Sequence, residues 1–361
     1  MDYNLLAARS RLIRSVRAFF DRRDYLETLT PLLSPDLIPE TCLEVFKTAF
    51  LPPRNSARTA AKPYYLIPSP EIWMKKLIAV HKKSLYQICS SFRNCESTGL
   101  MHSPEFLMLE YYTMNADYLD SLKITEDLFD FLLSENRADL LQFQTEEALA
   151  ELAPPFIRMT MDEAFVRYAG FSLNAAAANG TLRREAERLG LQIADGTSDA
   201  DIYNLIFIHA VEPNLPQEKP AALLDYPALV PCLACLKKDV GAGTGGAART
   251  AGTRGAAQAA SGVGGGISRE RWELYVRGIE TANCYSEETD AEEVRRYFEN
   301  EAVEKQKTAA VPHAIDGGYW RIFNTNGGFP RCSGAALGLD RLIMALCGKR
   351  TIDAVLPFPM R

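Results

Sequence analysis

The sequence predicts an α+β protein built mainly on an antiparallel β-sheet that helices flank. The first observation is the segment from Ser91 to Tyr112, which passes through polar residues and returns with apolar side chains at alternate positions. A period of two is typical of antiparallel strands, here joined by a long loop. The second observation is helical patterning outside the strand-like segments, over residues 8–23, 115–137 and 292–306.

The composition fits an ordinary soluble globular enzyme. The chain has 361 residues, of which 47% are hydrophobic and 24% charged. Its net charge of -6 gives no global basic field for nucleic acid. Eight cysteines without framework spacing, and no secretory signal, indicate reduced thiols in the cytoplasm. No apolar run reaches the roughly 20 residues that cross a bilayer, so we expect no membrane association.

The N-terminal region is predicted to contain one helix and two strands. The helix occupies about 8–23 and leads to Thr30 and Pro31; the pattern alone fits an ordinary core helix. Strand-like segments follow at 43–50 and 64–68, separated by polar residues that predict a loop.

Another helix is expected to begin at the triplet Ser69, Pro70 and Glu71. An acid in the first turn of a helix commonly does no more than offset the helix dipole, and this is the simplest role for Glu71. The adjacent cations Lys75 and Lys76 are predicted to be solvated.

Two further helices have recognisable starts. Asp117 is a plausible N-cap for the helix at 115–137. After the strand predicted at 156–161, either Thr160 or Asp162 caps the next helix.

Between these elements and the C-terminal third lie two segments of unusual composition. Cys232 and Cys235 form a C-x-x-C pair, but a zinc site needs a second ligand pair and none follows, so buried thiols are favoured. Residues 241–268 are rich in Gly and Ala without hydrophobic periodicity, which predicts a flexible insertion.

Charged residues in strand-like segments suggest a binding site. Arg93 and Glu110 could face one zwitterionic or phosphorylated ligand, although a surface hairpin with a salt bridge fits equally well. Glu273 and Glu280 would point to opposite faces of one continuous strand, and a bulge or bend at Gly278 would bring them together. They would then hold a divalent cation against phosphates, or else form a solvated strand edge.

Three blocks of sequence occur in a characteristic order. SFRNCE…HSPEFLMLEYY begins at Ser91, WELYVRGIETANCYSEETD occupies Trp272–Asp290, and CSGAALGLDRLIMAL occupies Cys332–Leu346. They resemble motif 2, the ELY…G.E.AN…EL.D segment and motif 3 of the lysyl branch of class II aminoacyl-tRNA synthetases. The N-terminal helix with Thr30 and Pro31 resembles motif 1, which forms the dimer interface in that family. The resemblance covers nearly the whole chain apart from the Gly/Ala-rich insertion.

The resemblance implies a class II catalytic core over residues 1–361, and it assigns roles to individual residues. It implies that ATP is bound by Arg93, Asn94, Glu96, Ser103, Phe106, Glu273, Leu274, Gly338 and Arg341. It implies that a lysine-type substrate is bound by Ser69, Glu71, Glu110, Tyr112, Glu280, Asn283, Tyr285, Glu287 and Ala336. Mg²⁺ would be held by Glu273 and Glu280, and the catalytic groups would be Arg93, Glu273 and Arg341.

The resemblance is strongest to the short lysyl-tRNA synthetase paralogues that modify elongation factor P. They join β-lysine to a lysine of that protein through an acyl-adenylate. Few residues precede the motif 1 helix, so an anticodon-binding OB domain of about a hundred residues is not expected. The expected lack of this domain and the acidic net charge both disfavour tRNA as the acceptor. Ala336, at a position where the tRNA enzymes have Gly, also disfavours it.

Two alternatives remain: an enzyme that acylates tRNA or another small acceptor, and a catalytically silent amino-acid sensor. Intact Arg93, Glu273, Glu280 and Arg341 argue against the silent sensor. In motif 2, Cys95 interrupts the usual Arg-Asn-Glu. Either Glu96 takes the usual position through a one-residue bulge or the adenine contact is altered. We expect a cytoplasmic homodimer that uses ATP and Mg²⁺.

Overall fold

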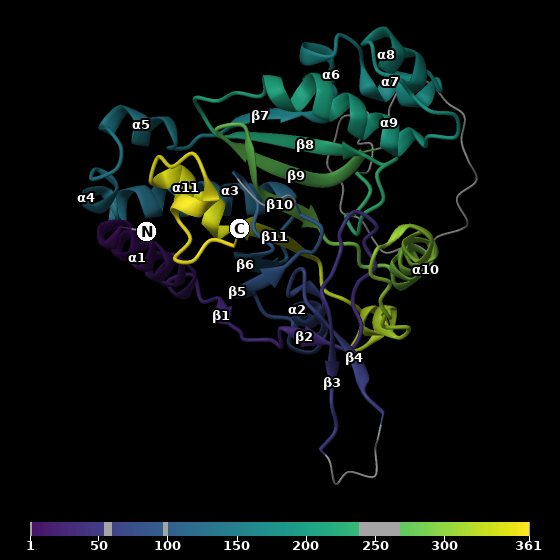
Figure 1. Cartoon of the computed structure of the whole chain (residues 1–361), viewed down its shortest axis with the longest axis horizontal. Helices are drawn as coiled ribbons and strands as arrows, with labels where there is room; N and C mark the ends of the chain where they lie inside the picture. The colour runs from purple at the N-terminus through teal and green to yellow at the C-terminus, as the bar shows by residue number, and fades with distance from the viewer. Residues whose placement is uncertain (1, 54–59, 97–99, 238–267, 361) are drawn as a thin grey trace, which may run out of the picture.

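A large mixed sheet organises the part of the chain that the structure, a computed structural model, describes, namely residues 2–53, 60–96, 100–237 and 268–360 (Figure 1). Within these residues the large sheet has eight strands in the order β1-β5-β6-β11-β10-β9-β8-β7. Its neighbours pair antiparallel except β1 with β5 and β7 with β8, which are parallel. The predicted α+β class with a mainly antiparallel sheet is confirmed.

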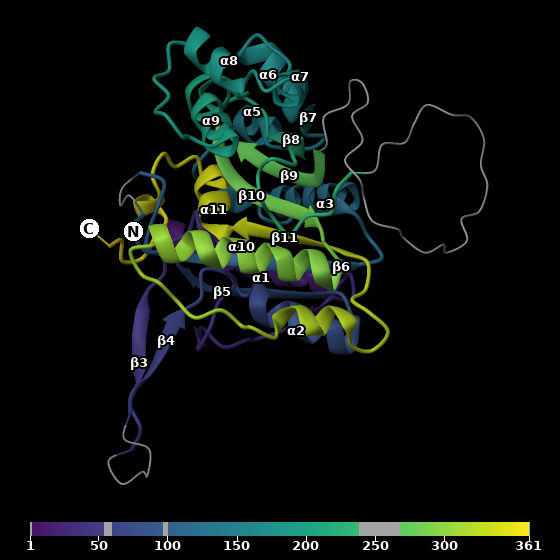
Figure 2. The same ribbon diagram turned by 90° about the vertical axis from the view of Figure 1, so that its right-hand side faces the viewer.

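The strands of the large sheet come from the whole length of the chain. They are β1 Leu26–Glu27, β5 Leu85–Phe92, β6 Glu105–Met114, β7 Ile157–Thr160, β8 Ala221–Pro227, β9 Ser268–Val276, β10 Ile279–Ser286 and β11 Cys332–Gly338. A small second sheet in the order β2-β4-β3 contains β2 Leu33–Ser34, β3 Lys47–Phe50 and β4 Lys62–Leu66. The β3–β4 hairpin extends away from the rest of the molecule (Figure 2).

Helices lie on both sides of the large sheet. They are α1 Tyr3–Asp21, α2 Glu71–His81, α3 Tyr118–Glu135, α4 Arg137–Leu140, α5 Glu146–Glu151, α6 Met161–Tyr168, α7 Leu173–Ala178, α8 Leu182–Arg188, α9 Asp199–Ile206, α10 Ala291–Thr308 and α11 Leu339–Leu346. In Figure 1, α1, α3 and α11 lie to one side of the sheet and α10 to the other, while α6–α9 gather beyond β7 and β8.

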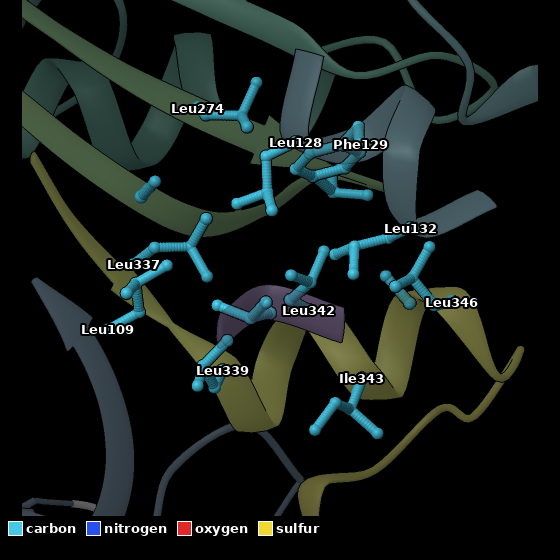
Figure 3. Close-up of a cluster of buried hydrophobic side chains, with 14 of the residues drawn as sticks. Leu109, Leu128, Phe129, Leu132, Leu274, Leu337, Leu339, Leu342, Ile343 and Leu346 are labelled. Atoms are coloured by element: carbon cyan, nitrogen blue, oxygen red, sulfur yellow. The ribbon is translucent and has the colours of Figure 1, made fainter. Parts of the chain in front are cut away.

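The main core fills the space between the sheet and α1, α3 and α11. Leu109, Leu274 and Leu337 point from β6, β9 and β11 toward side chains of α3 and α11, as Figure 3 shows. These residues alternate with the polar residues of the same strands, because successive side chains of a strand point to opposite faces. One face of the sheet is therefore committed to packing, which leaves the other face for polar groups.

The starts of several helices follow from capping residues. Asp117 caps α3 in a capping box with Asp120, as the sequence predicts. Thr160, rather than Asp162, caps α6 and forms a capping box with Glu163. Each cap satisfies backbone N–H groups that have no partner within the helix.

Some predicted boundaries need correction. The first helix begins at Tyr3, five residues before the predicted start at residue 8, and Leu5 is already buried in the core. The strand predicted at 43–50 contains only β3, because Asn94 pairs with the chain at Glu44 instead. Ser268, placed at the end of the Gly/Ala-rich insertion, instead begins β9, and residues 241–267 lie outside the described part of the chain.

Candidate active site

The polar face of the sheet carries most of the predicted site residues. Met108, Glu110 and Tyr112 alternate along β6 and pair with Gly338, Ala336 and Gly334 of β11. On its other edge, β11 pairs Ala336 with Asn283 and Gly334 with Tyr285 of β10. Because directly paired residues share a face, these side chains all project to the side opposite the core.

Glu273 and Glu280 reach this face from two strands rather than one. Arg277 and Gly278, both with positive φ, turn the chain between β9 and β10, so the bend expected at Gly278 is present. The β9–β10 register also shifts between Glu280 and Ala282. That bulge is needed because it puts Glu280 on the face of Glu273 and Asn283, whereas a regular strand would direct it into the core.

A cavity of about 290 Å³ lies over this face and contains both predicted phosphate-binding arginines, Arg93 and Arg341. The cavity is lined by many of the residues predicted to bind ATP, with others beside them: Arg93, Glu96, Ser103, Phe106, Glu280, Asn283, Ala336, Gly338 and Arg341. Arg93 follows β5, whereas Arg341 lies in the first turn of α11. The two guanidinium groups therefore share one cavity although they are far apart in the sequence.

Neighbouring groups fix the positions of the two arginines. The guanidinium of Arg93 lies over the ring of Phe106, 5.3 Å from its centroid, and its buried Nε has no hydrogen-bond acceptor among the described residues. Arg341 donates to the backbone oxygens of Glu280 at 2.7 Å and Met101 at 3.2 Å. Neither guanidinium forms an ion pair with a carboxylate of the described chain, so both can take an anionic ligand.

Motif 2 contains a backbone irregularity at the unusual cysteine. Cys95 has a positive φ of 58° and is exposed, whereas Glu96 lines the cavity near His102. The positive φ at Cys95 thus turns Cys95 outward while Glu96 faces the cavity. Asn94 does not line the cavity: its side-chain Nδ2 donates to the backbone oxygen of Val45.

Two other residues predicted to bind ATP sit apart from the cavity. Leu274 packs its side chain in the main core, so only its backbone could face a nucleotide. The Glu273 carboxylate pairs with Arg271 at 2.5 Å and accepts a hydrogen bond from Tyr275 Oη at 2.8 Å. The charge of Glu273 nevertheless contributes, after burial, to a pKa of about 7 for Glu280, which does line the cavity.

The two acids fit a divalent cation only in part. Among the described residues no group of three or more His, Cys, Asp or Glu side chains could hold a metal ion. A cation beside Glu280 and Glu273 would relieve the repulsion between their carboxylates. It would need further oxygen ligands from a bound molecule, as Mg²⁺ commonly does with phosphates.

A second, smaller cavity of about 80 Å³ adjoins the first. The two cavities share Arg93, Met108, Asn283 and Ala336 as lining residues. The small cavity also contains most of the residues predicted to bind the amino acid: Ser69, Glu71, Glu110, Tyr112, Tyr285 and Glu287. A ligand in the small cavity would therefore meet a ligand in the large one beside Arg93.

Glu110 lies deep in the small cavity and is only 3% exposed. Its carboxylate accepts hydrogen bonds from the hydroxyls of Ser69 and Tyr112, both at 2.7 Å. Burial, and secondly the nearby charge of Glu71, raise the pKa of Glu110 to about 8. An acid in such a place favours a cationic ligand, because an ammonium would compensate the buried charge.

The prediction that Lys75 is solvated is wrong. Lys75 is 1% exposed, and its Nζ lies 2.5 Å from Oε1 of Glu71 and 2.7 Å from Oε2 of Glu287. Lys76 is half-buried and pairs with Asp316 at 2.7 Å. Burial alone would lower the pKa of Lys75, but the two carboxylates hold it well above its usual range.

Close approach by side chains explains one glycine of the cavity floor. A Cβ at Gly334 would overlap Oε1 of Glu287 and the ring of Tyr112. Only glycine leaves room for both side chains, so steric space alone explains why β11 has a glycine at this position. Ala336, two residues along the same face, lines both cavities.

Sequence reasoning missed Glu40, which also lines the small cavity. Its carboxyl has a pKa raised to about 7, first by burial and then by the charge of Glu71. Glu40 lies in a segment without regular structure, so no periodicity could have located it. Its position next to Pro39 and Thr41 carries no signal of chemistry.

The C-x-x-C pair lies beside the site, where Cys235 contacts the chain at Ser286 and Glu287. Cys232 is buried, whereas Cys235 is half-buried, and its Sγ lies 2.9 Å from the backbone oxygen of Glu287. The backbone N–H of Cys235 also donates to Ser286. The expectation of buried thiols therefore holds for Cys232 alone. All eight cysteines are free of disulfides.

No helix in the described part of the chain is long and apolar enough to cross a membrane. The chain matches the family described as tRNA synthetases class II (D, K and N) over residues 2–361. It is 33% identical over 98% of its length to an "Elongation factor P--(R)-beta-lysine ligase" of Vibrio atlanticus, of which 95% is covered. Proteins of the same name from Pectobacterium atrosepticum and Yersinia enterocolitica are 31% and 32% identical, also over 98% of this chain and 94% of theirs.

Proposed function

Because this chain belongs to the class II family of tRNA synthetases (D, K and N), we propose that it is an ATP-dependent ligase that attaches (R)-β-lysine to a lysine of elongation factor P. The observation that carries the proposal is the pair of joined cavities. One contains two arginines without carboxylate partners among the described residues, the other several buried acids, and Arg93 lines both. Such an arrangement suits an anionic nucleotide beside a cationic amino acid.

In the first step, the carboxylate of the lysine-type substrate attacks the α-phosphorus of ATP. A bond forms between the carboxylate oxygen and phosphorus, the bond to the bridging oxygen breaks, and pyrophosphate leaves. Arg93 neutralises charge where the two substrates meet, and Arg341 holds the far phosphates. No protein nucleophile is required, because positioning and charge neutralisation supply the catalysis.

In the second step, the ε-amine of a lysine on elongation factor P attacks the acyl carbon of the adenylate. The new amide forms as the bond to AMP breaks, and the amine loses a proton. The acceptor is inferred from the names of the relatives, which span nearly the same length as this chain.

We further propose that Mg²⁺ is the divalent cation, held by Glu280 together with Glu273. When bound, it would withdraw charge from the phosphate oxygens. Glu280 supports this role because it lines the large cavity, and burial together with the charge of Glu273 raises its pKa to about 7, an effect that a bound cation would oppose.

The remaining proposals concern assembly and location. Exposed apolar side chains near the N-terminus, such as Tyr3, Leu26 and Leu29, support a homodimer formed through α1 and β1. Sedimentation of the full chain would test this assembly. We place the enzyme in the cytoplasm, as the free cysteines suggest.

The deciding experiment has two stages. Pyrophosphate exchange into ATP is measured with (R)-β-lysine and with α-lysine. The activated amino acid, carrying a radiolabel, is then offered to purified elongation factor P and to tRNA in parallel. We expect exchange with β-lysine and label on the protein, with a mass increase equal to one lysyl group.

Other outcomes would replace the proposal with a specific alternative. Label on tRNA without label on elongation factor P would identify a lysyl-tRNA synthetase-like enzyme. Exchange with neither lysine would identify a catalytically silent sensor. Arg341→Ala provides the background for the exchange assay, since it removes one phosphate-binding group.

A further inference from the structure

The acids of the small cavity fall into two groups according to the cations that they already contact. Glu71 and Glu287 share the buried ammonium of Lys75. Glu110 receives hydrogen bonds only from the neutral hydroxyls of Ser69 and Tyr112. Within the described chain, no hydrogen bond or ion pair engages the carboxylate of Glu40. A diammonium ligand would therefore find two acids without a cation of their own, Glu40 and Glu110.

The segment that carries Glu40 is fixed in place by helix α10. Lys305 is buried, and its Nζ donates to the backbone oxygens of Glu40, at 2.6 Å, and Leu43. Four residues earlier in α10, Glu301 accepts from Thr41 through both the backbone N–H at 3.1 Å and Oγ1 at 2.9 Å. These bonds hold the backbone from Glu40 to Leu43, so the carboxylate of Glu40 has a defined position at the cavity wall.

The surroundings of Glu40 indicate which part of a ligand it would meet. The charged groups that act on its carboxyl are Glu71, then Arg93, Lys305 and Lys75. Arg93 is also the residue at which the two cavities join, where the substrate carboxylate must approach ATP. Glu110, by contrast, is enclosed by the hydroxyls of Ser69 and Tyr112, and the charged groups that act most on it are Glu71 and Lys75. Glu40 thus belongs to the carboxylate end of the ligand and Glu110 to the far end.

We propose that Glu40 is a further substrate-binding residue, which takes the ammonium group nearer to the carboxylate of the substrate. Glu110 takes the side-chain ammonium. Lys75 keeps Glu71 and Glu287 in place and prevents them from competing with Glu40 and Glu110 for the same charges. This inference rests on the proposed function, because it assumes that a diamine carboxylate is the substrate that ATP activates.

The test compares ligands that differ by one amine. Pyrophosphate exchange is measured with β-lysine and α-lysine, and 6-aminohexanoate, which lacks the nearer amine, is tested as a competitive inhibitor of both. Glu40→Gln keeps the shape of the side chain but removes its charge. We expect the variant to raise KM for both lysines by roughly tenfold to a hundredfold, the range for a lost hydrogen bond to a charged group. The inhibition constant of 6-aminohexanoate should change by less than about twofold.

Two matched variants distinguish substrate contact from a structural effect. Glu44→Gln changes an acid in the same segment whose carboxylate binds the backbone N–H groups of Ala310 and Val311, outside both cavities. It should leave KM for the lysines near the wild-type value. Glu110→Gln should weaken binding of 6-aminohexanoate as well as binding of both lysines. In Glu40→Gln, KM for ATP should stay unchanged, which shows that the large cavity is intact.

The inference is overturned if Glu40→Gln leaves KM for both lysines within twofold of the wild type. It is also overturned if Glu40→Gln weakens binding of 6-aminohexanoate as much as binding of the lysines, because Glu40 would then affect the shape of the whole cavity. If 6-aminohexanoate does not inhibit the wild type, the comparison of KM between Glu40→Gln and Glu44→Gln decides. A wild-type enzyme that exchanges with neither lysine refutes the proposed function itself. Exchange by the wild type that is insensitive to Glu40→Gln refutes only the inference.

Discussion

The ammonium of Lys75 lies 2.7 Å from the carboxylate of Glu287, and the two side chains are only 1% and 2% exposed. Such a pair contributes little net stability compared with an apolar pair, because both charges lose their hydration. Its effect is on position: Lys75 connects α2 to the residue after β10 and places an ammonium group between two carboxylates of the small cavity. The substrate pocket is thus charged before any substrate arrives.

Removing Lys75 should destabilise the protein in a pH-dependent way. Lys75→Met leaves the buried carboxylate of Glu287 without its cation, a change that costs about 3–5 kcal/mol in the free energy of unfolding at neutral pH. Burial raises the pKa of Glu287 to about 7, so protonation neutralises that carboxylate in acid and the cost should shrink toward pH 5. Denaturant unfolding at several pH values measures this. Lys76→Met, which alters a half-buried neighbour, should show a smaller and flatter effect; equal losses in both variants would contradict the role of Lys75.

Gly334→Ala should strongly weaken binding of the lysine-type substrate without affecting binding of ATP. The added methyl group would overlap Glu287 and the ring of Tyr112, so at least one of these side chains must leave its position. We expect KM for the amino acid to rise by roughly a hundredfold, as when a charged contact is lost. Calorimetric titration with a non-hydrolysable ATP analogue should give a nearly unchanged Kd. Gly317→Ala is the control, since no atom lies within 4 Å of the added Cβ.

Arg341→Ala should weaken binding of ATP rather than binding of the amino acid. Arg341 lines the large cavity but not the small one, whereas Arg93 lines both. Loss of one charge-assisted phosphate contact corresponds to about 1.5–3 kcal/mol, which is roughly a tenfold to hundredfold rise in KM for ATP. Steady-state exchange kinetics provide the measurement, and Arg350→Ala removes an exposed arginine as the control. A selective rise in KM for lysine would contradict the proposal that Arg341 binds ATP.

Affinity for the lysine-type substrate should increase with pH. The pKa of Glu110 is raised to about 8, chiefly by burial and then by Glu71, so its carboxyl is protonated at lower pH and cannot pair fully with an ammonium. KM should therefore fall between about pH 6 and 9, and Glu110→Gln should flatten that dependence. A profile that is flat in the wild type would contradict the raised pKa.

The raised pKa of Glu110 has the opposite effect on the stability of the protein without substrate, which should fall as the pH rises. Because the pKa of Glu110 in the folded state exceeds its usual value of 4.5, its contribution to stability is fully present below that value. The contribution is lost as the pH rises through about 8, when a buried charge must form. The stabilisation conferred by bound substrate should consequently be larger at pH 8 than at pH 6, which thermal unfolding can measure.

Patterns of alternation made the polar face of the sheet predictable. Alternation in the segment from Ser91 to Tyr112 predicts that Met108 and Glu110 share one side of a strand, and the register with β5 and β11 confirms it. Lys75 could not be placed in the same way. A Glu and a Lys four residues apart in a helix usually form a solvated pair, and the sequence does not reveal that β10 brings Glu287 against them. Burial of that pair depends on tertiary packing.

The position of the bulge was likewise beyond sequence reasoning. The bend at Gly278 was predictable because glycine tolerates positive φ. The shift between Glu280 and Ala282 was not, since Thr281 is an ordinary strand residue. Glu40 was missed for a related reason: it lies in irregular backbone, held by long-range bonds to α10 that leave no local pattern.

The extra residue between Glu280 and Ala282 makes the start of β10 depend on the number of residues there rather than on their chemistry. Excising Thr281 would let the ladder with β9 close without interruption, and Glu280 would keep its pairing with Tyr275 and its face. Adding one residue at the same place would instead turn Glu280 by half a turn, sending its carboxylate toward the leucines. A deletion of Thr281, or many substitutions of it, should therefore be tolerated better than a single insertion beside it.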